Sequence, residues 1–313
     1  MSVALVTSPV FAPRDTDRGA PSALPETSRR IRVGMPHLDA AGLSENWLFR
    51  HAGELHWEAI AQRLGVASHD IRGDAGARLY PTVVAVRARY EAALANVREN
   101  DVLDSRVEVV PCGRSSAHGR IVVANGEHRF TLELLTTFAA REPDGLRTAP
   151  LAAPLARRWT PAPGPLPVIA RLARAARRRE PVDDPFAGAA LARDGQPLGS
   201  VPYEPSPYAD YNGAGLLYFA SYVTIADSAE RQLVRRLGLG GSHLQDWALA
   251  TSAVRRDVYY YENLPLGAAL IASLHQLDRD PHGVSTHVRL SRAEDGRPMA
   301  DVIARRHFTT GAR

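Results

Sequence analysis

Tyrosines stand at three places in the sequence where a hydroxyl group could serve a reaction. Tyr80 follows the loop sequence RGDAGAR, Tyr218 and Tyr222 lie one helical turn apart, and residues 259 to 261 are all tyrosine. A phenol has a pKa of about 10 and therefore keeps its proton at neutral pH. It can donate a hydrogen bond or a proton to a developing enolate, but it needs strong activation to act as a nucleophile. A plain amphipathic core role remains the alternative for each of these tyrosines.

Two segments predict helices whose N-termini could hold a thioester oxygen. Ser44 and Asn46 stand at the first helix start, and the turn sequence NGAG, residues 212 to 215, precedes the second. Backbone N–H groups at a helix start, with its partial positive charge, stabilise an oxyanion or enolate. Asn46 and Tyr80 are therefore the candidate catalytic residues. The candidate substrate-binding residues are Ser44, His51, Asn212, Gly213, Tyr218 and Tyr222. Ser44 fits a structural helix cap equally well.

Spacing and residue type exclude several common catalytic sites. His51 and His56 are five residues apart, so they do not share a helix face as a zinc-binding HExxH pair does. Every basic residue is arginine, and without lysine no Schiff base can form. The chain has no GxSxG nucleophile motif and no P-loop. Cys112 lies in the sequence CGRSSAHG, where a polar loop is favoured over a nucleophile. No metal and no cofactor are predicted.

The composition bounds the class of protein. Hydrophobic residues make up 45% of the 313 residues and charged residues 23%, which is typical of a globular protein with a core. A formal net charge of only +4 argues against binding to nucleic acid. No apolar run is long enough to span a membrane. The single cysteine excludes an internal disulfide and is compatible with a reducing compartment, so we expect a cytoplasmic protein.

The elements that must position these residues occur twice in the same order. Residues 42 to 65 and 215 to 238 each predict a helix that is apolar almost all round and ends at a glycine. Strand-like sequence and a two-residue hairpin signal follow each helix, at Asn125-Gly126 and Asp295-Gly296. The helix repeat and the hairpin repeat have nearly equal offsets. This indicates duplication of one α+β unit.

A long buried helix followed by antiparallel strands is typical of the hot-dog fold, in which the sheet curls around the helix. The sequence therefore predicts an α+β double hot-dog fold, with two tandem units that each wrap a long central helix in an antiparallel sheet; another α+β sandwich is the alternative. We expect a flexible leader over residues 1–30 and the first unit over 31–142. A connector rich in proline and arginine follows over 143–199, and the second unit spans 200–313.

Three stretches of the sequence resemble one enzyme family. They are GMPHLDAAGLSENWLFRHAGELHW (Gly34–Trp57), RLY (Arg78–Tyr80) and NGAGLLYFASY (Asn212–Tyr222). Over residues 31 to 313 the chain resembles the LnmK-type bifunctional acyltransferase/decarboxylases of leinamycin biosynthesis. The third stretch is shared more loosely with many hot-dog thioesterases.

The resemblance implies a homodimer that decarboxylates methylmalonyl-CoA and passes the propionyl group to the phosphopantetheine of an acyl carrier protein in polyketide biosynthesis. It also implies tyrosines in place of a serine or cysteine nucleophile, and by position Tyr80 is the match, with Tyr218 or Tyr222 as additional tyrosines. The arginine-rich stretch Arg171–Arg179 could receive the acidic carrier protein, although a solvated basic linker explains it as well.

Three rival functions remain open at the level of sequence. A hot-dog thioesterase acting on acyl-CoA or an acyl carrier protein could use Asp227 or Glu230 as a base or nucleophile. A dehydratase would need a paired histidine and acid in the substrate tunnel. The third alternative is a non-catalytic module that docks a carrier protein. The fold alone does not choose among them.

Overall fold

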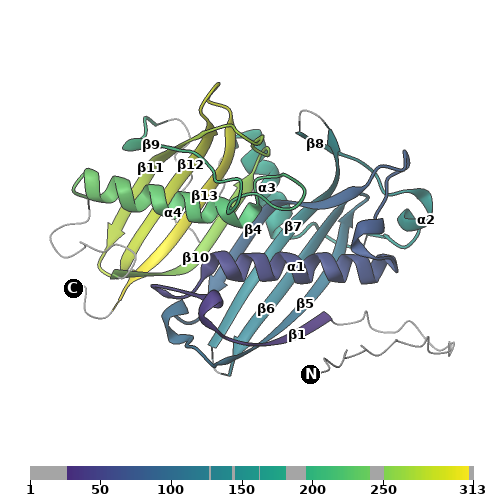
Figure 1. Cartoon of the computed structure of the whole chain (residues 1–313), viewed down its shortest axis with the longest axis horizontal. Helices are drawn as coiled ribbons and strands as arrows, with labels where there is room; N and C mark the ends of the chain where they lie inside the picture. The colour runs from purple at the N-terminus through teal and green to yellow at the C-terminus, as the bar shows by residue number, and fades with distance from the viewer. Residues whose placement is uncertain are drawn as a thin grey trace, which may run out of the picture.

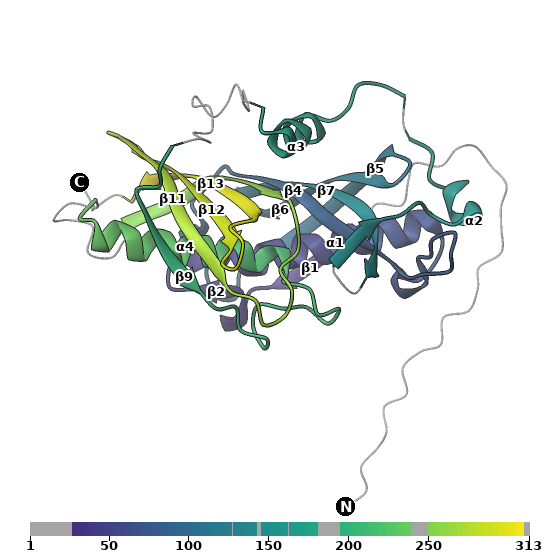
Figure 2. The same cartoon turned by 90° about the horizontal axis from the view of Figure 1, so that it is seen from above.

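The computed structural model describes residues 27–126, 128–142, 145–161, 163–180, 195–239 and 250–309. These residues form an eleven-stranded antiparallel sheet and a separate two-stranded ribbon, β2 (Leu38–Asp39) with β3 (Gly42–Leu43). Two long helices, α1 (Glu45–Leu64) and α4 (Phe219–Arg236), lie against one face of the large sheet (Figure 1). A shorter helix, α3 (Val168–Arg178), lies on the opposite face (Figure 2).

The strands of the large sheet come from two halves of the chain. The first half supplies β1 (Thr27–Arg32), β4 (Leu79–Tyr90), β5 (Val102–Gly113), β6 (Ser116–Asn125), β7 (His128–Glu142) and β8 (Gly145–Thr148). The second half supplies β9 (Gly199–Tyr203), β10 (Thr251–Tyr260), β11 (Leu270–Asp280), β12 (Gly283–Arg292) and β13 (Pro298–Phe308). The short helix α2 (Ala153–Ala156) and three single-turn 3-10 helices at 35–37, 68–70 and 94–96 complete the described elements.

Both halves build their part of the sheet in the same order. Reading outward from the centre, the first half runs β4-β7-β6-β5-β1 and the second half runs β10-β13-β12-β11-β9. The halves meet where β4 pairs with β10, and we call this junction the seam. Each helix therefore packs against an equivalent set of antiparallel strands.

The predicted helices form for the reasons that their sequences indicate. In α1 the stripe Leu48, Ala52, Leu55 and Ala59 is buried, and the helix ends at Gly65, which has a φ of 65°. In α4 the corresponding stripe is Tyr222, Ala226, Ala229 and Leu233, and it is buried as well. The main core lies between these two helices and the sheet.

The second helix begins later than the sequence predicts. The prediction placed it from residue 215, but α4 starts at Phe219. The side-chain oxygen of Asn212 accepts hydrogen bonds from the backbone N–H groups of Ala214 and Leu216, at 3.0 and 3.2 Å. These hydrogen bonds hold residues 212 to 216 in a turn, so the helix begins only after them.

Six strands of the structure were not predicted from the sequence: β1, β2, β3, β8, β9 and β10. Residues 27 to 30, assigned to the flexible leader, belong to β1, which pairs with β5. The remaining leader, residues 1 to 26, lies outside the described residues. Neither β9 nor β10 was predicted. Within the connector, α3 is longer than the one or two turns expected, and its buried residues pack on the outer face of the sheet against Ala85, Leu135 and Tyr259.

The seam opens at one end. Only Ala85–Arg89 of β4 pairs with β10, where it faces Arg255–Tyr259. Residues 79 to 83 of β4 pair with β7 on one side, and among the described strands none pairs with them on the other. A bulge between Val83 and Ala85 lies where the pairing stops. The sheet therefore has a gap between the first half of β4 and the chain that follows Tyr260.

No helix among the described residues is both long enough and apolar enough to cross a membrane.

Candidate functional site

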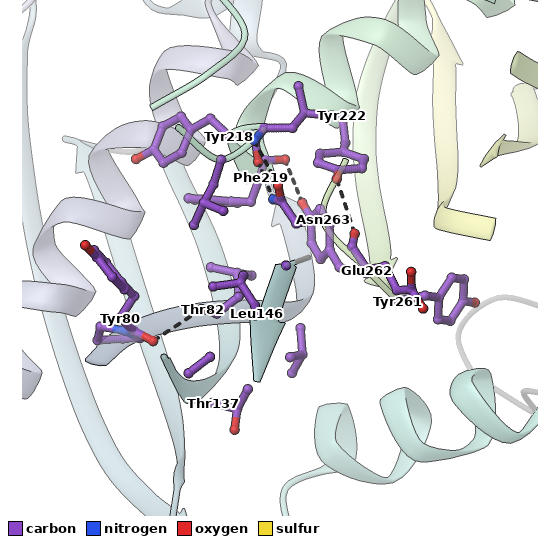
Figure 3. Close-up of a pocket in the computed structure, with 18 of the residues that line it drawn as sticks. Tyr80, Thr82, Thr137, Leu146, Tyr218, Phe219, Tyr222, Tyr261, Glu262 and Asn263 are labelled. Carbon is purple, nitrogen blue, oxygen red and sulfur yellow. Dashed lines mark hydrogen bonds between the residues drawn. The ribbon is translucent and has the colours of Figure 1, made fainter. Parts of the chain in front are cut away.

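A cavity of about 390 Å³ fills the gap in the seam, and we call it the seam pocket. Its walls come from α1, β4, β7, β8, the start of α4 and the segment 260–263 (Figure 3). Arg177 of α3 also lines it. Helices α3 and α4 lie on opposite faces of the sheet (Figure 2). Because residues of both helices line the pocket, we infer that it reaches both faces of the sheet.

The pocket brings together four of the residues that the sequence singled out. Tyr80, Asn212, Tyr218 and Tyr222 all line it. Tyr80 comes from β4 in the first half of the chain, and the other three come from the second half. Figure 3 shows Tyr80 across the pocket from Tyr222, with Leu146 between them.

Three tyrosine hydroxyls near the pocket already have acceptors. Tyr222 donates to the backbone carbonyl of Glu262 at 3.3 Å, and Tyr260 donates to that of Phe219 at 2.9 Å. Tyr261 donates to the Asp301 carboxylate at 2.6 Å. Burial raises the pKa of both Tyr222 and Tyr260 above the usual value of a phenol. The hydroxyls of Tyr222 and Tyr260 therefore stay protonated, and the three hydrogen bonds hold the pocket wall together.

The hydroxyls of Tyr80 and Tyr218 have no hydrogen-bond acceptor among the described residues. Arginine side chains cover both rings, with Arg78 over Tyr80 and Arg50 over Tyr218, each 4.8 Å from the ring centre. Burial raises the pKa of the Tyr218 phenol, although the Arg50 guanidinium opposes the shift. Tyr218 is therefore protonated at neutral pH and able to donate a hydrogen bond to a ligand.

The start of α4 forms one wall of the pocket. Tyr218 is the N-cap residue, and its side chain makes no capping hydrogen bond. In the described part of the chain, the backbone N–H groups of Phe219 and Ala220 make no hydrogen bond. Unpaired N–H groups at a helix start carry a partial positive charge and bind anionic oxygen.

Asn263 fixes the position of this helix start. Its side-chain amide donates to the carbonyl of Leu217 at 2.9 Å and accepts from the N–H of Leu217 at 3.1 Å. The chain entering α4 is thus clamped to the segment that leaves β10. The sequence analysis did not select Asn263. Its role depends on contact with Leu217, which is distant in the sequence, and no motif around Asn263 indicates that contact.

Asn46 and Ser44 lie away from the seam pocket. The amide nitrogen of Asn46 donates to the carbonyl of Ala220 at 3.2 Å and to the Thr224 hydroxyl at 2.9 Å, and its oxygen accepts from Arg50 at 2.8 Å. Asn46 thereby joins α1 to α4. Ser44 is the N-cap of α1 and accepts from the N–H of Trp47 at 3.5 Å, which matches the structural alternative given above.

His51 and Gly213 do not line the seam pocket either. His51 bonds to the Ser105 hydroxyl at 2.8 Å and stacks on Trp47, with the ring centres 5.0 Å apart. Burial, and next the positive charge of Arg29, lower its pKa to about 4, so the imidazole is neutral at pH 7. It faces a second cavity of about 450 Å³, which shares Trp57 and Tyr218 with the seam pocket. Gly213 is exposed in the turn before α4.

Asp227 and Glu230 are held in ion pairs with arginines; Glu230 is buried and Asp227 is half-buried. Asp227 lies 2.9 Å from Arg256 and 2.6 Å from Arg306, and Glu230 lies 3.1 Å from Arg306 and accepts from Thr286 at 2.6 Å. Burial alone would raise the pKa of Asp227, but the two guanidinium groups lower it. Neither carboxylate lines the seam pocket. They are therefore poorly placed to serve a thioesterase as base or nucleophile.

Cys112 lies near the end of strand β5 and not in the polar loop that the sequence favoured, and it lines a groove of about 360 Å³ beneath α3. Burial raises the pKa of its thiol, which disfavours the reactive thiolate. Among the described residues, no cluster of three or more histidine, cysteine, aspartate or glutamate side chains is placed to hold a metal ion.

Comparison with known proteins identifies the fold. No protein-family model matches the chain, and no curated protein matches its sequence. Among solved structures, a protein assigned as an oleoyl thioesterase from Lactobacillus plantarum matches with a TM-score of 0.64 at 12% identity, over 90% of this chain and 95% of that one. A 12:0-ACP thioesterase from Umbellularia californica matches with a TM-score of 0.63 at 12% identity, over 91% and 94%.

An acyl-ACP thioesterase from Bacteroides thetaiotaomicron also matches, with a TM-score of 0.52 at 12% identity, over 90% of this chain and 98% of the other. The chain has the α+β hot-dog fold. Its long helices packed against a large antiparallel sheet agree with the sequence prediction. At 12% identity, the similarity between this chain and these three structures shows a common fold and does not show a common activity.

Proposed function

We propose that this hot-dog protein is an enzyme that acts on an acyl thioester of coenzyme A or of an acyl carrier protein. The observation that carries the proposal is the seam pocket, whose lining includes Tyr218 and Phe219 at the start of α4, where the N–H groups of Phe219 and Ala220 make no hydrogen bond among the described residues. The thioesterases of the same fold support a thioester substrate.

The thioester carbonyl oxygen binds at the start of α4. The N–H groups of Phe219 and Ala220 donate to it, and the Tyr218 hydroxyl is a further donor. Negative charge that develops on this oxygen is stabilised by donors that are already fixed in place, which is the usual means of stabilising an enolate or a tetrahedral intermediate. Asn263 acts as a positioning residue, because it holds the chain at Leu217.

The reaction that best fits the tyrosines is decarboxylation followed by acyl transfer. Leu146, Leu217 and Phe219 give the pocket apolar walls that weaken solvation of a methylmalonyl carboxylate and favour loss of carbon dioxide. The electrons of the broken C–C bond form an enolate, and the phenol of Tyr80 protonates its carbon. Solvent then returns a proton to Tyr80. The thiol of the carrier protein attacks the propionyl carbonyl, and the thiol of coenzyme A leaves.

Hydrolysis is the second candidate, because the solved structures of the same fold are thioesterases. Against it, the described lining of the seam pocket contains no histidine, and its one carboxylate, Glu262, is paired with Arg297 at 3.1 Å. A dehydratase would need a histidine and an acid together, which this lining also lacks. A module that only docks a carrier protein would bind the phosphopantetheine arm without turnover.

The wider assignment rests on the sequence motifs. We propose that residues 31–142 and 200–313 are tandem hot-dog units joined by the connector 143–199, that two chains form a homodimer, and that the enzyme supplies a propionyl unit for polyketide biosynthesis in the cytoplasm. The equal strand order in the two halves supports the tandem arrangement.

The test is to incubate the protein with methylmalonyl-CoA and a phosphopantetheinylated carrier protein, and then to measure the intact mass of the carrier. A propionyl adduct on the carrier is the expected result. Free acid together with an unloaded carrier would show that the protein hydrolyses the thioester and does not transfer the acyl group. Unchanged methylmalonyl-CoA would contradict an enzymatic role with this substrate.

A further inference from the structure

Two arginines of α3 stand at the outer end of the seam pocket, on the face of the sheet opposite α4. We propose that Arg174 and Arg177 bind the phosphate of the phosphopantetheine arm that carries the acyl group. The inference rests on the proposed function, because it assumes that a thioester enters the seam pocket with its acyl end toward α4.

The packing of α3 determines which of its residues face the pocket. Ile169, Leu172 and Ala176 are buried against the outer face of the sheet. The arginine side chains of the helix are exposed. Arg177 lines the seam pocket, and its guanidinium donates to the carbonyls of Tyr260 and Tyr261 at 3.3 Å each. These bonds hold Arg177 beside the opening.

Arg174 lies one turn earlier and lines the adjacent groove beneath α3, the groove that also contains Cys112. This groove and the seam pocket have a common wall. The residues that line both are Val84, Thr137, Thr148, Arg177, Tyr260 and Tyr261. The two spaces are therefore neighbours, and a ligand leaving the seam pocket on this face passes Arg177 and Arg174 in turn.

Within the described parts of the chain, both arginines are without an acidic partner. No carboxylate among the described residues forms an ion pair with Arg174 or Arg177. Neighbouring arginines differ, because Arg178 lies 3.8 Å from Glu180 and Arg297 lies 3.1 Å from Glu262. Two guanidinium groups without counter-charges at the mouth of a pocket favour a phosphate, to which arginine donates paired hydrogen bonds.

The two ends of the pocket thus suit the two ends of one ligand. The start of α4 and Tyr218 suit a thioester oxygen on the inner side, and the arginines suit a phosphate on the outer side. Between them, the hydroxyls of Thr137 and Thr148 provide hydrogen-bonding groups for the amides of a pantetheine arm. Coenzyme A and a carrier protein share this arm and its first phosphate, so either one can be the source.

The experiment compares the binding of 4′-phosphopantetheine and pantetheine by titration calorimetry. We expect the wild-type protein to bind phosphopantetheine about 10- to 100-fold more tightly, since a hydrogen bond to a charged group contributes about 1.5–3 kcal/mol. In the double variant Arg174→Gln/Arg177→Gln this preference should disappear. The matched control is Arg171→Gln, an exposed α3 arginine that lines neither space, and it should keep the preference.

Two further ligands distinguish the sources. If the shared phosphate is bound, coenzyme A and a phosphopantetheinylated carrier both lose affinity in the double variant. A loss confined to coenzyme A would assign the arginines to its nucleotide phosphates and overturn the inference. Equal or undetectable binding of phosphopantetheine and pantetheine to the wild type would also overturn it. Selective phosphopantetheine binding without any turnover would leave the inference standing and contradict the proposed catalysis instead.

Discussion

The guanidinium of Arg256 on β10 lies 2.6 Å from the carboxylate of Glu45 on α1, so a buried ion pair joins the second half of the chain to the first. Tyr90 donates to the same carboxylate at 2.8 Å, and Arg256 also pairs with Asp227 on α4 at 2.9 Å. The network lies between the two helices and the paired part of the seam. We infer that it holds the halves in the relative position that the seam pocket requires.

Replacing Arg256 by methionine should destabilise the protein strongly. Arg256 is 1% exposed, and its loss leaves the buried carboxylate of Glu45 and the half-buried carboxylate of Asp227 without this counter-charge. Breaking a buried ion pair from one side typically costs about 3–5 kcal/mol. Urea unfolding measures the loss. Arg30→Met is the control, because Arg30 pairs with Asp104 on the surface and its removal should leave the free energy of unfolding nearly unchanged. Equal effects of the two variants would contradict the account.

Removing the Tyr218 hydroxyl should impair catalysis without weakening the fold. Since this hydroxyl has no acceptor in the described part of the protein, Tyr218→Phe breaks no hydrogen bond there. Loss of one oxyanion donor commonly lowers kcat about 100-fold or more. The matched variant Tyr222→Phe loses the bond to the Glu262 carbonyl and should lower stability more than kcat. Steady-state kinetics and thermal unfolding of both variants test this, and a Tyr218→Phe enzyme with unchanged kcat would remove Tyr218 from the mechanism.

Tyr80→Phe separates proton transfer from binding. If Tyr80 protonates the enolate, the variant should release carbon dioxide from methylmalonyl-CoA more slowly or form propionyl product more slowly, while its KM stays similar. Mass spectrometry of product formed in deuterated water measures the protonation step. Wild-type rates in the Tyr80→Phe variant would show that another group supplies the proton.

Adding a methyl group at Gly53 should disturb the start of α4 from across the helix interface. A Cβ at this position would lie 2.8 Å from the ring of Phe219 and 3.6 Å from the Tyr218 hydroxyl. Gly53→Ala should therefore displace Phe219 and lower activity, with a stability loss of about 1–3 kcal/mol from overpacking. The second-site change Phe219→Leu makes room and should recover part of the stability. If the double variant is no more stable than Gly53→Ala, this contact is not the cause.

The free energy of unfolding should decrease as the pH is lowered from 7.5 to 5. A histidine in the unfolded chain has a pKa of about 6.5. In the folded protein, burial as the main cause and the charge of Arg29 as the second cause lower the pKa of His51 to about 4. Burial and then the charge of His118 lower the pKa of His56 to about 3. The unfolded chain thus binds protons at higher pH than the folded one, so stability is lost as the pH falls below about 6.5. At pH 5 the loss is about 2 kcal/mol for each histidine.

Urea unfolding at several pH values measures this loss, and in His56→Gln the wild-type loss at pH 5 should shrink by about 2 kcal/mol because one titrating group is gone. A wild-type free energy of unfolding that does not change over this range would contradict the neutral, buried state of both rings.

The helices and hairpins could be predicted because their signals are local. The stripe Leu48, Ala52, Leu55 and Ala59 and the stop at Gly65 lie within one segment. β10 could not be predicted in this way, because Arg255, Arg256 and Asp257 interrupt its apolar pattern. Their compensating charges come from distant parts of the chain, among them Glu45 and Arg87.

The candidate site, too, could be predicted from the sequence only in part. Tyr80, Tyr218 and Tyr222 could be selected by residue type, and the fold brings them to one pocket. Whether the start of α1 or that of α4 faces the pocket depends on how the helices pack. Asn46 contacts Ala220 instead of facing the seam pocket, so only the start of α4 is available to a ligand there.

The most direct test of the account is hydrogen exchange, followed by mass spectrometry, with a non-reactive thioether analogue of methylmalonyl-CoA. The account predicts slower exchange in peptides that cover the start of α4 and residues 79 to 84 of β4, because the analogue would contact the N–H groups of Phe219 and Ala220 and fill the gap in the seam. Protection confined to the second cavity beside Arg29 and His51 would contradict the placement of the thioester in the seam pocket.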